Sequence, residues 1–274
     1  MTVYGLYARE TGGWMSVASL VKLLARLDVE EPVVRSAIFR LKRRGLLEAV
    51  KVAGVAGYGL TEEARMILDE GDRRIFERHR ATESDGWLLA VFSVPESERD
   101  KRHLLRSRLT FLGFGTVSAG VWIAPAHVYE ETRETLERHG LNVYVELFRG
   151  DHLAFADTVD RVPEWWDLAK LRSLYEDFLR RYEPVLASYR RRRSPVEPAQ
   201  AFTDYVTALT DWRRLPYAEP GLPAAALPVD WPGQPAADTF FELRSRLAGP
   251  AHRFVDEISA SALPARASGA GPPR

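Results

Sequence analysis

The sequence predicts a protein of the α+β class with three folded segments, and three patterns along the chain support this prediction. Residues 1–80 show amphipathic helical spacing followed by short alternating strands. Residues 81–162 alternate between apolar strand-like runs and helical runs, and residues 163–260 are mostly helical in spacing. Residues 261–274 are rich in Ala, Gly, Pro and Ser, so we expect a disordered tail there.

The first segment predicts two helices joined by a short turn. Leu20, Leu23 and Leu27 fall on one apolar face of a helix expected over 17–27. Pro32 suits the start of a second helix, because the first N–H groups of a helix have no partner within the helix. Short strands over 47–52 and 58–60 follow, with a loop of small residues between them. This order is typical of a winged helix-turn-helix.

Positive charge is concentrated on the second of these helices. Six Lys or Arg and a single acid, Glu48, lie between Pro32 and Lys51, although the whole chain balances 38 basic against 38 acidic residues. A local basic site in a neutral protein favours DNA binding, with a merely solvated helix face or a dimerisation module as alternatives. The residues that we expect to contact DNA are Arg35, Ser36, Arg40 and Arg43 on the helix, and Lys51 and Tyr58 on the wing.

The middle segment predicts a small α/β sandwich. Strands are expected over 87–94 and 141–148, helices over 96–112 and 126–139, and a hairpin within 114–123. The order strand, helix, two strands, helix, strand indicates a ferredoxin-like fold.

The third segment predicts helices over 163–189, 199–213 and 236–260, with a proline-rich stretch over 217–235. Its aromatic residues could line an aryl pocket, although aromatic residues at helical spacing more often form a core. The arginine run 190–193 could bind phosphate groups, although such runs more often are solvated helix ends. The candidate effector-binding residues are Trp165, Trp212, Arg191 and Arg192.

Several protein classes are disfavoured by the composition. The chain has no cysteine, which excludes disulfides and zinc fingers, and no apolar run near the ~20 residues of a membrane span. The first ten residues lack the apolar core of a signal peptide, so we expect a cytoplasmic protein without a membrane partner. The six histidines show no metal-ligand spacing, and no nucleotide or hydrolase motif is present. We therefore predict no metal, no cofactor and no catalytic residues.

Short motifs in a fixed order carry a resemblance to a known family. They are Tyr4-Gly5, Gly12-Gly13, the run Val34–Leu41, Trp87-Leu88-Leu89, Gly113-Phe114-Gly115, residues 175–184, and the proline-rich stretch 222–233. Over nearly the whole chain this pattern resembles the PaaX family, the repressors of phenylacetic-acid degradation operons. Family members usually have a further segment before the Tyr-Gly pair, whereas only Met1–Val3 precede it here.

The resemblance implies a ligand-responsive repressor that binds a palindromic operator as a homodimer. The implied effector is an aryl-CoA thioester such as phenylacetyl-CoA. We expect its pocket between the middle segment and the C-terminal helices.

The middle segment also resembles the second CRISPR-associated protein, a ferredoxin-like nuclease. That nuclease carries a metal-binding Asp at the end of its first strand, where this chain has Ser93. Because Mg²⁺ needs carboxylate oxygens, we expect a structural or dimerising role and no nuclease activity. A nuclease and a helical protein–protein adaptor remain the alternative functions.

Overall fold

The computed structural model describes residues 1–77, 79–153, 155 and 157–262. The chain forms two compact units. Unit 1 contains Met1–Asp69, Leu186–Thr210 and the chain from Phe241 onward, whereas unit 2 contains Glu70–Val185 and Asp211–Phe240. The region predicted as one C-terminal helical segment therefore contributes residues to both units. The predicted tail lies outside the described residues from position 263 on.

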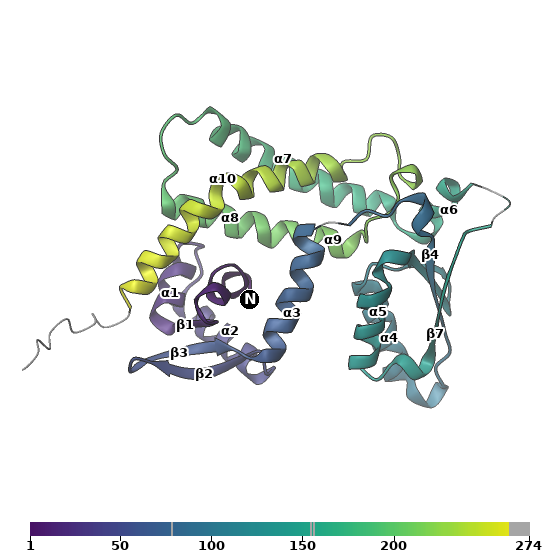
Figure 1. Ribbon diagram of the computed structural model, residues 1–274, viewed down its shortest axis with the longest axis horizontal. Coiled ribbons are helices and arrows are strands. Elements are labelled where there is room, and N and C mark those ends of the chain that lie inside the picture. Colours follow the sequence, from purple (N-terminus) through teal and green to yellow (C-terminus); the bar gives the residue numbers. More distant parts are fainter. Residues whose placement is uncertain (78, 154, 156, 263–274) are drawn as a thin grey trace, which may run out of the picture. The chain divides into compact units, whose positions relative to one another are not determined.

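The N-terminal part of unit 1 is a helix-turn-helix followed by a β-hairpin. Its elements are a π-helical segment Tyr4–Ala8, β1 (Trp14–Ser16), α1 (Val17–Ala25), α2 (Glu31–Arg43), β2 (Leu47–Val52), β3 (Val55–Leu60) and the start of α3 (Glu62–Asp72). The strands form an antiparallel sheet in the order β1-β3-β2, and the β2–β3 hairpin projects from it (Figure 1). The predicted pair of helices and pair of strands are present, and β1 is a strand that the sequence analysis missed.

Local hydrogen bonds explain where α1 and α2 begin and end. The Ser16 hydroxyl accepts a 2.9 Å hydrogen bond from the Ser19 N–H, which caps α1. Gly45 takes a φ of +71° after α2. The N–H groups of Gly45 and Leu46 then donate to the carbonyls of Lys42 and Leu41, each at 3.0 Å. This pair of bonds is a Schellman motif, for which glycine is the favoured residue.

The hairpin is longer than the sequence predicted. Only Ala53 and Gly54 form its turn, with φ values of +50° and +81°, as a two-residue type I′ turn requires. Gly57 was expected in the loop but lies within β3, paired with Val50 and Ser16. A Cβ atom on Gly57 would lie 2.4 Å from the Met15 carbonyl oxygen, so glycine permits the close approach of β1.

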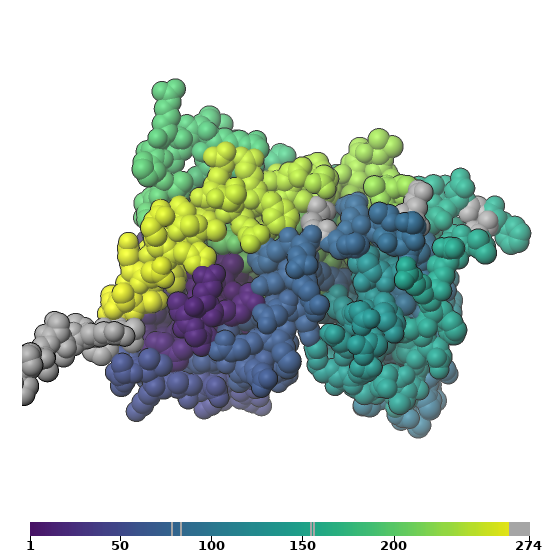
Figure 2. Space-filling view, in the orientation of Figure 1, coloured from purple at the N-terminus to yellow at the C-terminus, as the bar shows by residue number. Residues whose placement is uncertain are grey.

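Two later helices contribute to the core of unit 1. They are α8 (Pro198–Trp212) and the C-terminal part of α10 (Gly233–Ala260). Tyr7 packs on Phe202 of α8 with ring centroids 5.8 Å apart, and on His252 of α10 at 4.8 Å. Figure 2 shows the yellow end of α10 beside the purple N-terminal segment. The N-terminal segment is thus packed between helices that come from the other end of the sequence.

Unit 2 contains a four-stranded antiparallel sheet in the order β5-β6-β4-β7. The elements follow the predicted order as β4 (Trp87–Phe92), α4 (Arg99–Phe111), β5 (Gly115–Ser118), β6 (Val121–Pro125), α5 (Tyr129–Arg138) and β7 (Val145–Gly150). The hairpin predicted within 114–123 is formed by β5 and β6. Helices α4 and α5 lie together on one face of the sheet (Figure 1).

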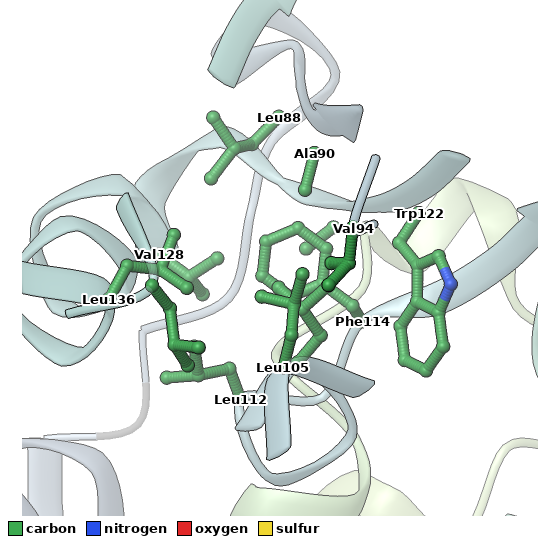
Figure 3. Packing of buried hydrophobic residues seen from close by; sticks show 12 residues of the cluster. Leu88, Ala90, Val94, Leu105, Leu112, Phe114, Trp122, Val128 and Leu136 are labelled. Atoms are coloured by element: carbon green, nitrogen blue, oxygen red, sulfur yellow. The ribbon is translucent and has the colours of Figure 1, made fainter. Parts of the chain in front are cut away.

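Each face of this sheet carries a cluster of buried residues. Leu88 and Ala90 point into a core that includes Leu105 of α4 and Leu136 of α5 (Figure 3). The neighbouring residue Trp87 belongs to a second cluster on the other face. That cluster also contains Ile123, Val162, Trp165, Trp166, Leu171, Leu222, Ala226 and Leu227. The alternation follows from the two-residue period of a strand.

The C-terminal region corrects one prediction. Instead of one helix over 163–189, it forms α6 (Thr158–Trp165) and α7 (Leu168–Arg191), and α9 (Leu215–Ala218) follows α8. Trp166 is extended, with φ −123° and ψ 141°. Its indole N–H donates a 2.9 Å hydrogen bond to the Gly113 carbonyl. This tertiary contact stabilises a break in the helix that periodicity alone did not indicate.

Candidate nucleic-acid interface

The outer face of α2 is the candidate interface in unit 1. Val34 and Ile38 point inward and are buried. Arg35, Ser36, Phe39, Arg40 and Arg43 are all exposed. These five residues recur at helical spacings of three and four, so they share one side of the helix, here called the outer face.

Hydrogen bonds along the helix hold two of its arginines. Arg35 is bound to Glu31 one turn earlier, with Nε to Oε1 at 2.7 Å. Arg40 donates from Nη1 to the Ser36 hydroxyl at 2.9 Å. Ser36 is uncharged, so this bond orients the Arg40 guanidinium without neutralising its charge. Arg35, by contrast, shares its charge with Glu31, and we expect it to contribute less to phosphate binding.

Most cations of this region have no acidic partner in the part of the chain that the structure describes. No carboxylate lies within ion-pair distance of Arg40, Lys42, Arg43, Arg44 or Lys51 there. Elsewhere most arginines of the helices are paired, as Arg133 is with Glu130 and Glu137. An uncompensated basic strip favours a polyanionic partner.

Phe39 is a residue of the outer face that the sequence analysis missed. Its side chain is 59% exposed. The guanidinium carbon of Arg43 lies 6.0 Å from the centroid of its ring. The signal was present in the sequence, because Phe39 is four residues from both Arg35 and Arg43 and therefore cannot share the inward face of Val34 and Ile38.

The two predicted wing residues differ in exposure. Lys51 is exposed on β2 next to the hairpin turn, opposite Ala56. Tyr58 is half-buried, and its backbone carbonyl accepts a 3.1 Å hydrogen bond from the Tyr4 hydroxyl. Lys51 thus remains well placed for a phosphate contact, whereas Tyr58 also has a packing role.

The predicted effector residues do not form one open site in the structure. Trp212 is completely buried, stacks on Phe240 with centroids 4.9 Å apart, and donates to the Ile75 carbonyl. Trp165 is 8% exposed and packs against Trp87. Both tryptophans are core residues of unit 2, and Trp212 has no exposed surface for a ligand.

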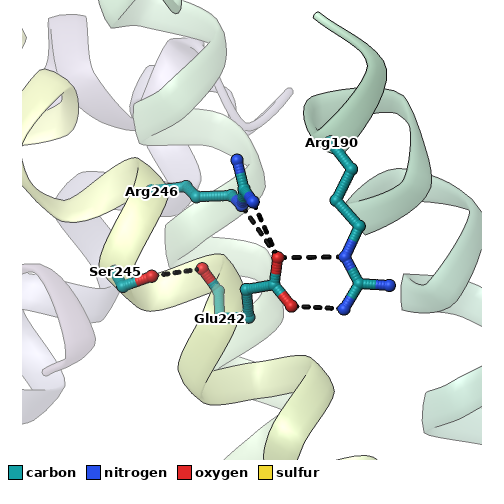
Figure 4. A network of polar contacts seen from close by, with 4 residues as sticks. All are labelled: Arg190, Glu242, Ser245 and Arg246. Atoms are coloured by element: carbon teal, nitrogen blue, oxygen red, sulfur yellow. Dashed lines mark hydrogen bonds and ion pairs between the residues drawn. The ribbon is translucent and has the colours of Figure 1, made fainter.

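The arginine run belongs to unit 1. Arg190 is not free for a phosphate, because its guanidinium is paired with Glu242, which Arg246 also binds (Figure 4). Hydrogen bonds from Arg190 lower the pKa of the Glu242 carboxyl to about 2. Arg191 and Arg192 are exposed, and the Arg192 guanidinium lies 5.6 Å from the Tyr189 ring.

A polar cavity of about 200 Å³ lies within unit 2. Its lining comes from residues 70–77 and 79–80, from 127–131 in the middle segment, and from Tyr175 and 216–221 in the C-terminal region. The Arg74 guanidinium stabilises the lining of this cavity, because it binds Glu131 and the carbonyls of Leu112 and Pro216. Burial, together with the nearby His79 and Arg74, lowers the pKa of His127 to about 4. His127 is therefore neutral at pH 7.

The middle segment shows no metal centre in its described part. Ser93 follows β4, and its backbone N–H donates to the Tyr144 carbonyl at 3.1 Å. Among the described residues of the whole chain, no group of three or more His, Cys, Asp or Glu side chains could hold a metal ion. No helix in the described chain is both long and apolar enough to cross a bilayer.

Comparisons with known proteins cover most of the chain. Three family models match: a PaaX-like protein over residues 1–64, the PaaX protein central Cas2-like domain over 80–162, and the PaaX-like protein C-terminal domain over 166–257. The transcriptional repressor PaaX of Escherichia coli strain K12 is 26% identical over 275 residues, which covers 97% of this chain and 86% of that protein. A solved structure of an uncharacterised protein from Mycobacterium tuberculosis matches with a TM-score of 0.56 at 19% identity, over 92% of this chain and 99% of that one.

Proposed function

The chain belongs to the PaaX family, and we propose that it is a transcriptional repressor that binds operator DNA through α2. The observation that carries the proposal is the outer face of α2, where Arg40 and Arg43 have no acidic partner among the described residues. The curated relative is a transcriptional repressor, which supports the same role here. In this proposal unit 1 presents a winged helix-turn-helix, with α2 in the major groove and the β2–β3 hairpin as the wing.

The β-α-β-β-α-β order of unit 2 supports a ferredoxin-like middle domain. We propose that it stabilises or dimerises the protein rather than cutting nucleic acid, because Ser93 stands where the related nuclease has its acid. A homodimer would present α2 twice, which suits a palindromic operator with half-sites about 10 base pairs apart. A repressor of this kind acts in the cytoplasm.

Gel-shift titration of operator duplexes tests the DNA-binding proposal. The duplexes are enriched from a randomised pool by the full-length protein. Arg40→Ala is expected to weaken binding by roughly 1–3 kcal/mol if this residue hydrogen-bonds a guanine. Arg133→Ala is the matched control, because this arginine, with a side chain 41% exposed, lies in unit 2 and pairs with its own helix.

Four outcomes would contradict the proposal. Failure to enrich any duplex would contradict DNA reading, and unchanged affinity in Arg40→Ala would contradict the assignment of α2. An adaptor would keep a protein partner after charge reversal in α2, and cleavage of duplex DNA or RNA that EDTA abolishes would favour a nuclease.

We propose further that an aryl-CoA thioester, such as phenylacetyl-CoA, relieves repression. Thermodynamic linkage requires this effector to bind the DNA-incompetent state more tightly than the competent one. The unit 2 cavity is a candidate pocket by its position alone, since its lining comes from both segments between which the pocket is expected. Arg191 and Arg192 stay the alternative phosphate-binding residues.

Calorimetry with phenylacetyl-CoA, phenylacetate and coenzyme A separates these two sites. Loss of thioester binding in Arg73→Ala, whose side chain lines the cavity, would favour the cavity. Loss in Arg191→Ala/Arg192→Ala would favour the arginine run. No binding of any of the three compounds would contradict an aryl-CoA effector.

A further inference from the structure

Phe39 is an exposed aromatic residue in the centre of a polar face. Its neighbours on the outer face of α2 are Arg35, Ser36, Arg40 and Arg43, and all four have hydrogen-bonding head groups. The inward residues Val34 and Ile38 already supply the apolar contact of α2 with the rest of unit 1. Phe39 therefore adds nothing to this core, and its ring is left 59% exposed to water.

An aromatic residue is an unexpected choice for an exposed helix position on physical grounds. Phenylalanine is a weaker helix former than Arg, Lys or Glu, and a ring that stays 59% exposed gains little burial energy. The position of the Arg43 guanidinium, 6.0 Å from the ring centroid, is consistent with a weak cation–π contact. Such a contact is worth little at an exposed site, so stability of the free protein does not account for this side chain.

We propose that Phe39 reads thymine, by placing its ring against the C5-methyl group of that base in the major groove. This inference rests on the proposed function, in which α2 enters that groove. The thymine methyl is the apolar group that the major groove presents, and apolar side chains contact it. Arginines one turn away on either side would bind guanine edges or phosphates, while Phe39 would select the neighbouring base by its methyl group.

Charge favours DNA over a second protein as the partner of this ring. Arg40 and Arg43 flank Phe39 and have no acidic partner among the described residues. Two copies of this face would repel each other, whereas a polyphosphate surface attracts it. A single ring is also far smaller than the ~800 Å² per partner that a specific protein interface buries.

The experiment is a cycle of two proteins and two duplexes. Wild-type and Phe39→Ala proteins are titrated with the enriched operator and with copies in which single thymines are replaced by deoxyuridine. This replacement removes only the methyl group. At one position in each half-site, wild-type affinity is expected to fall roughly fourfold, which corresponds to burial of one methyl group. At that position Phe39→Ala is expected to bind both duplexes equally.

Met66→Ala is the matched control, because Met66 is also an exposed apolar residue of a unit 1 helix, at 50%, but lies on α3 rather than on α2. It should keep the wild-type response to deoxyuridine. Thermal unfolding of each variant excludes a folding defect. Removal of the Phe39 ring could also displace the neighbouring Arg43 guanidinium, and Arg43→Ala measures the effect of losing that guanidinium alone.

Different failures have different meanings. If no duplex is enriched, the proposed function fails. If Arg40→Ala weakens binding but no thymine methyl is sensed through Phe39, only the present inference fails. A change of oligomeric state in Phe39→Ala, with an unchanged deoxyuridine response, would assign the ring to a contact between copies and would also overturn the inference.

Discussion

Trp166 and Gly113 are joined by a 2.9 Å hydrogen bond from the indole N–H to the backbone carbonyl. Gly113 has a φ of +84°, and the Trp166 ring also covers Gly115 two residues later. Glycine is required at the two positions for different reasons: Gly113 permits a left-handed turn after α4, and Gly115 permits the close approach of the Trp166 indole. The same contact ends α6 and attaches the C-terminal region to the sheet within unit 2.

Gly115→Ala is expected to destabilise unit 2. A Cβ atom at this position would lie 2.7 Å from the Trp166 ring and 2.9 Å from the Trp165 carbonyl oxygen. Overpacking of this kind costs about 1–3 kcal/mol. Denaturant unfolding followed by tryptophan fluorescence measures the effect. Gly150→Ala is the control, because nothing lies within 4 Å of its Cβ position, and equal stability of the two variants would contradict the packing argument.

Arg74→Ala is expected to lower the stability of unit 2 more than Gly115→Ala does. The Arg74 side chain is 9% exposed and donates to both oxygens of Glu131, at 3.0 and 2.9 Å, and to two backbone carbonyls. Removing one partner of a buried pair costs about 3–5 kcal/mol, and the lower end applies because Glu131 is 27% exposed. The measurement is a shift of the unfolding midpoint. Arg133→Ala instead removes an arginine of α5 whose side chain is 41% exposed. A loss of stability as large as that of Arg74→Ala would argue against burial as the cause.

Lys51→Ala is expected to weaken DNA binding equally on all sequences. Lys51 is exposed beside the hairpin turn, where a wing contacts phosphate rather than bases. Loss of one phosphate contact should reduce the slope of log affinity against log salt by about 1. Binding measured from low to high salt, on specific and random duplexes, gives both quantities. A loss confined to the specific duplex would assign base readout to Lys51.

The His127 imidazole is expected to make stability depend on pH between 6.5 and about 4. Burial lowers its pKa from 6.5 to about 4 in the folded protein. Between these values the unfolded chain binds more protons at this site, so stability falls as the pH falls. His127→Gln should flatten this part of the profile, measured as unfolding midpoint against pH. The groups that face His127 include His79, Arg74 and Asp85, so His79→Gln serves as the comparison. An unchanged slope of unfolding midpoint against pH in His127→Gln would count against the assignment of this pH dependence to His127.

Local chemistry accounts for most of what the sequence determined by itself. The capping of α1 by Ser16, the Schellman motif at Gly45 and the period of the β4 residues depend on neighbours a few positions away. Such signals can be read from a single chain. For the same reason the cationic strip on α2 could be predicted, because helical spacing alone places Arg40 and Arg43 on one side.

Tertiary contacts decided the rest. Strand β1 has only three residues, too few for a visible alternation, and it exists because Gly57 lets it approach β3. The break before α7 depends on Gly113, more than fifty residues away, and the burial of Trp212 depends on Phe240. The sequence determined which residues are apolar, aromatic or charged and which elements they form locally. Only packing between distant segments decided which aromatic residues of the C-terminal region became core, as Trp212 did against Phe240.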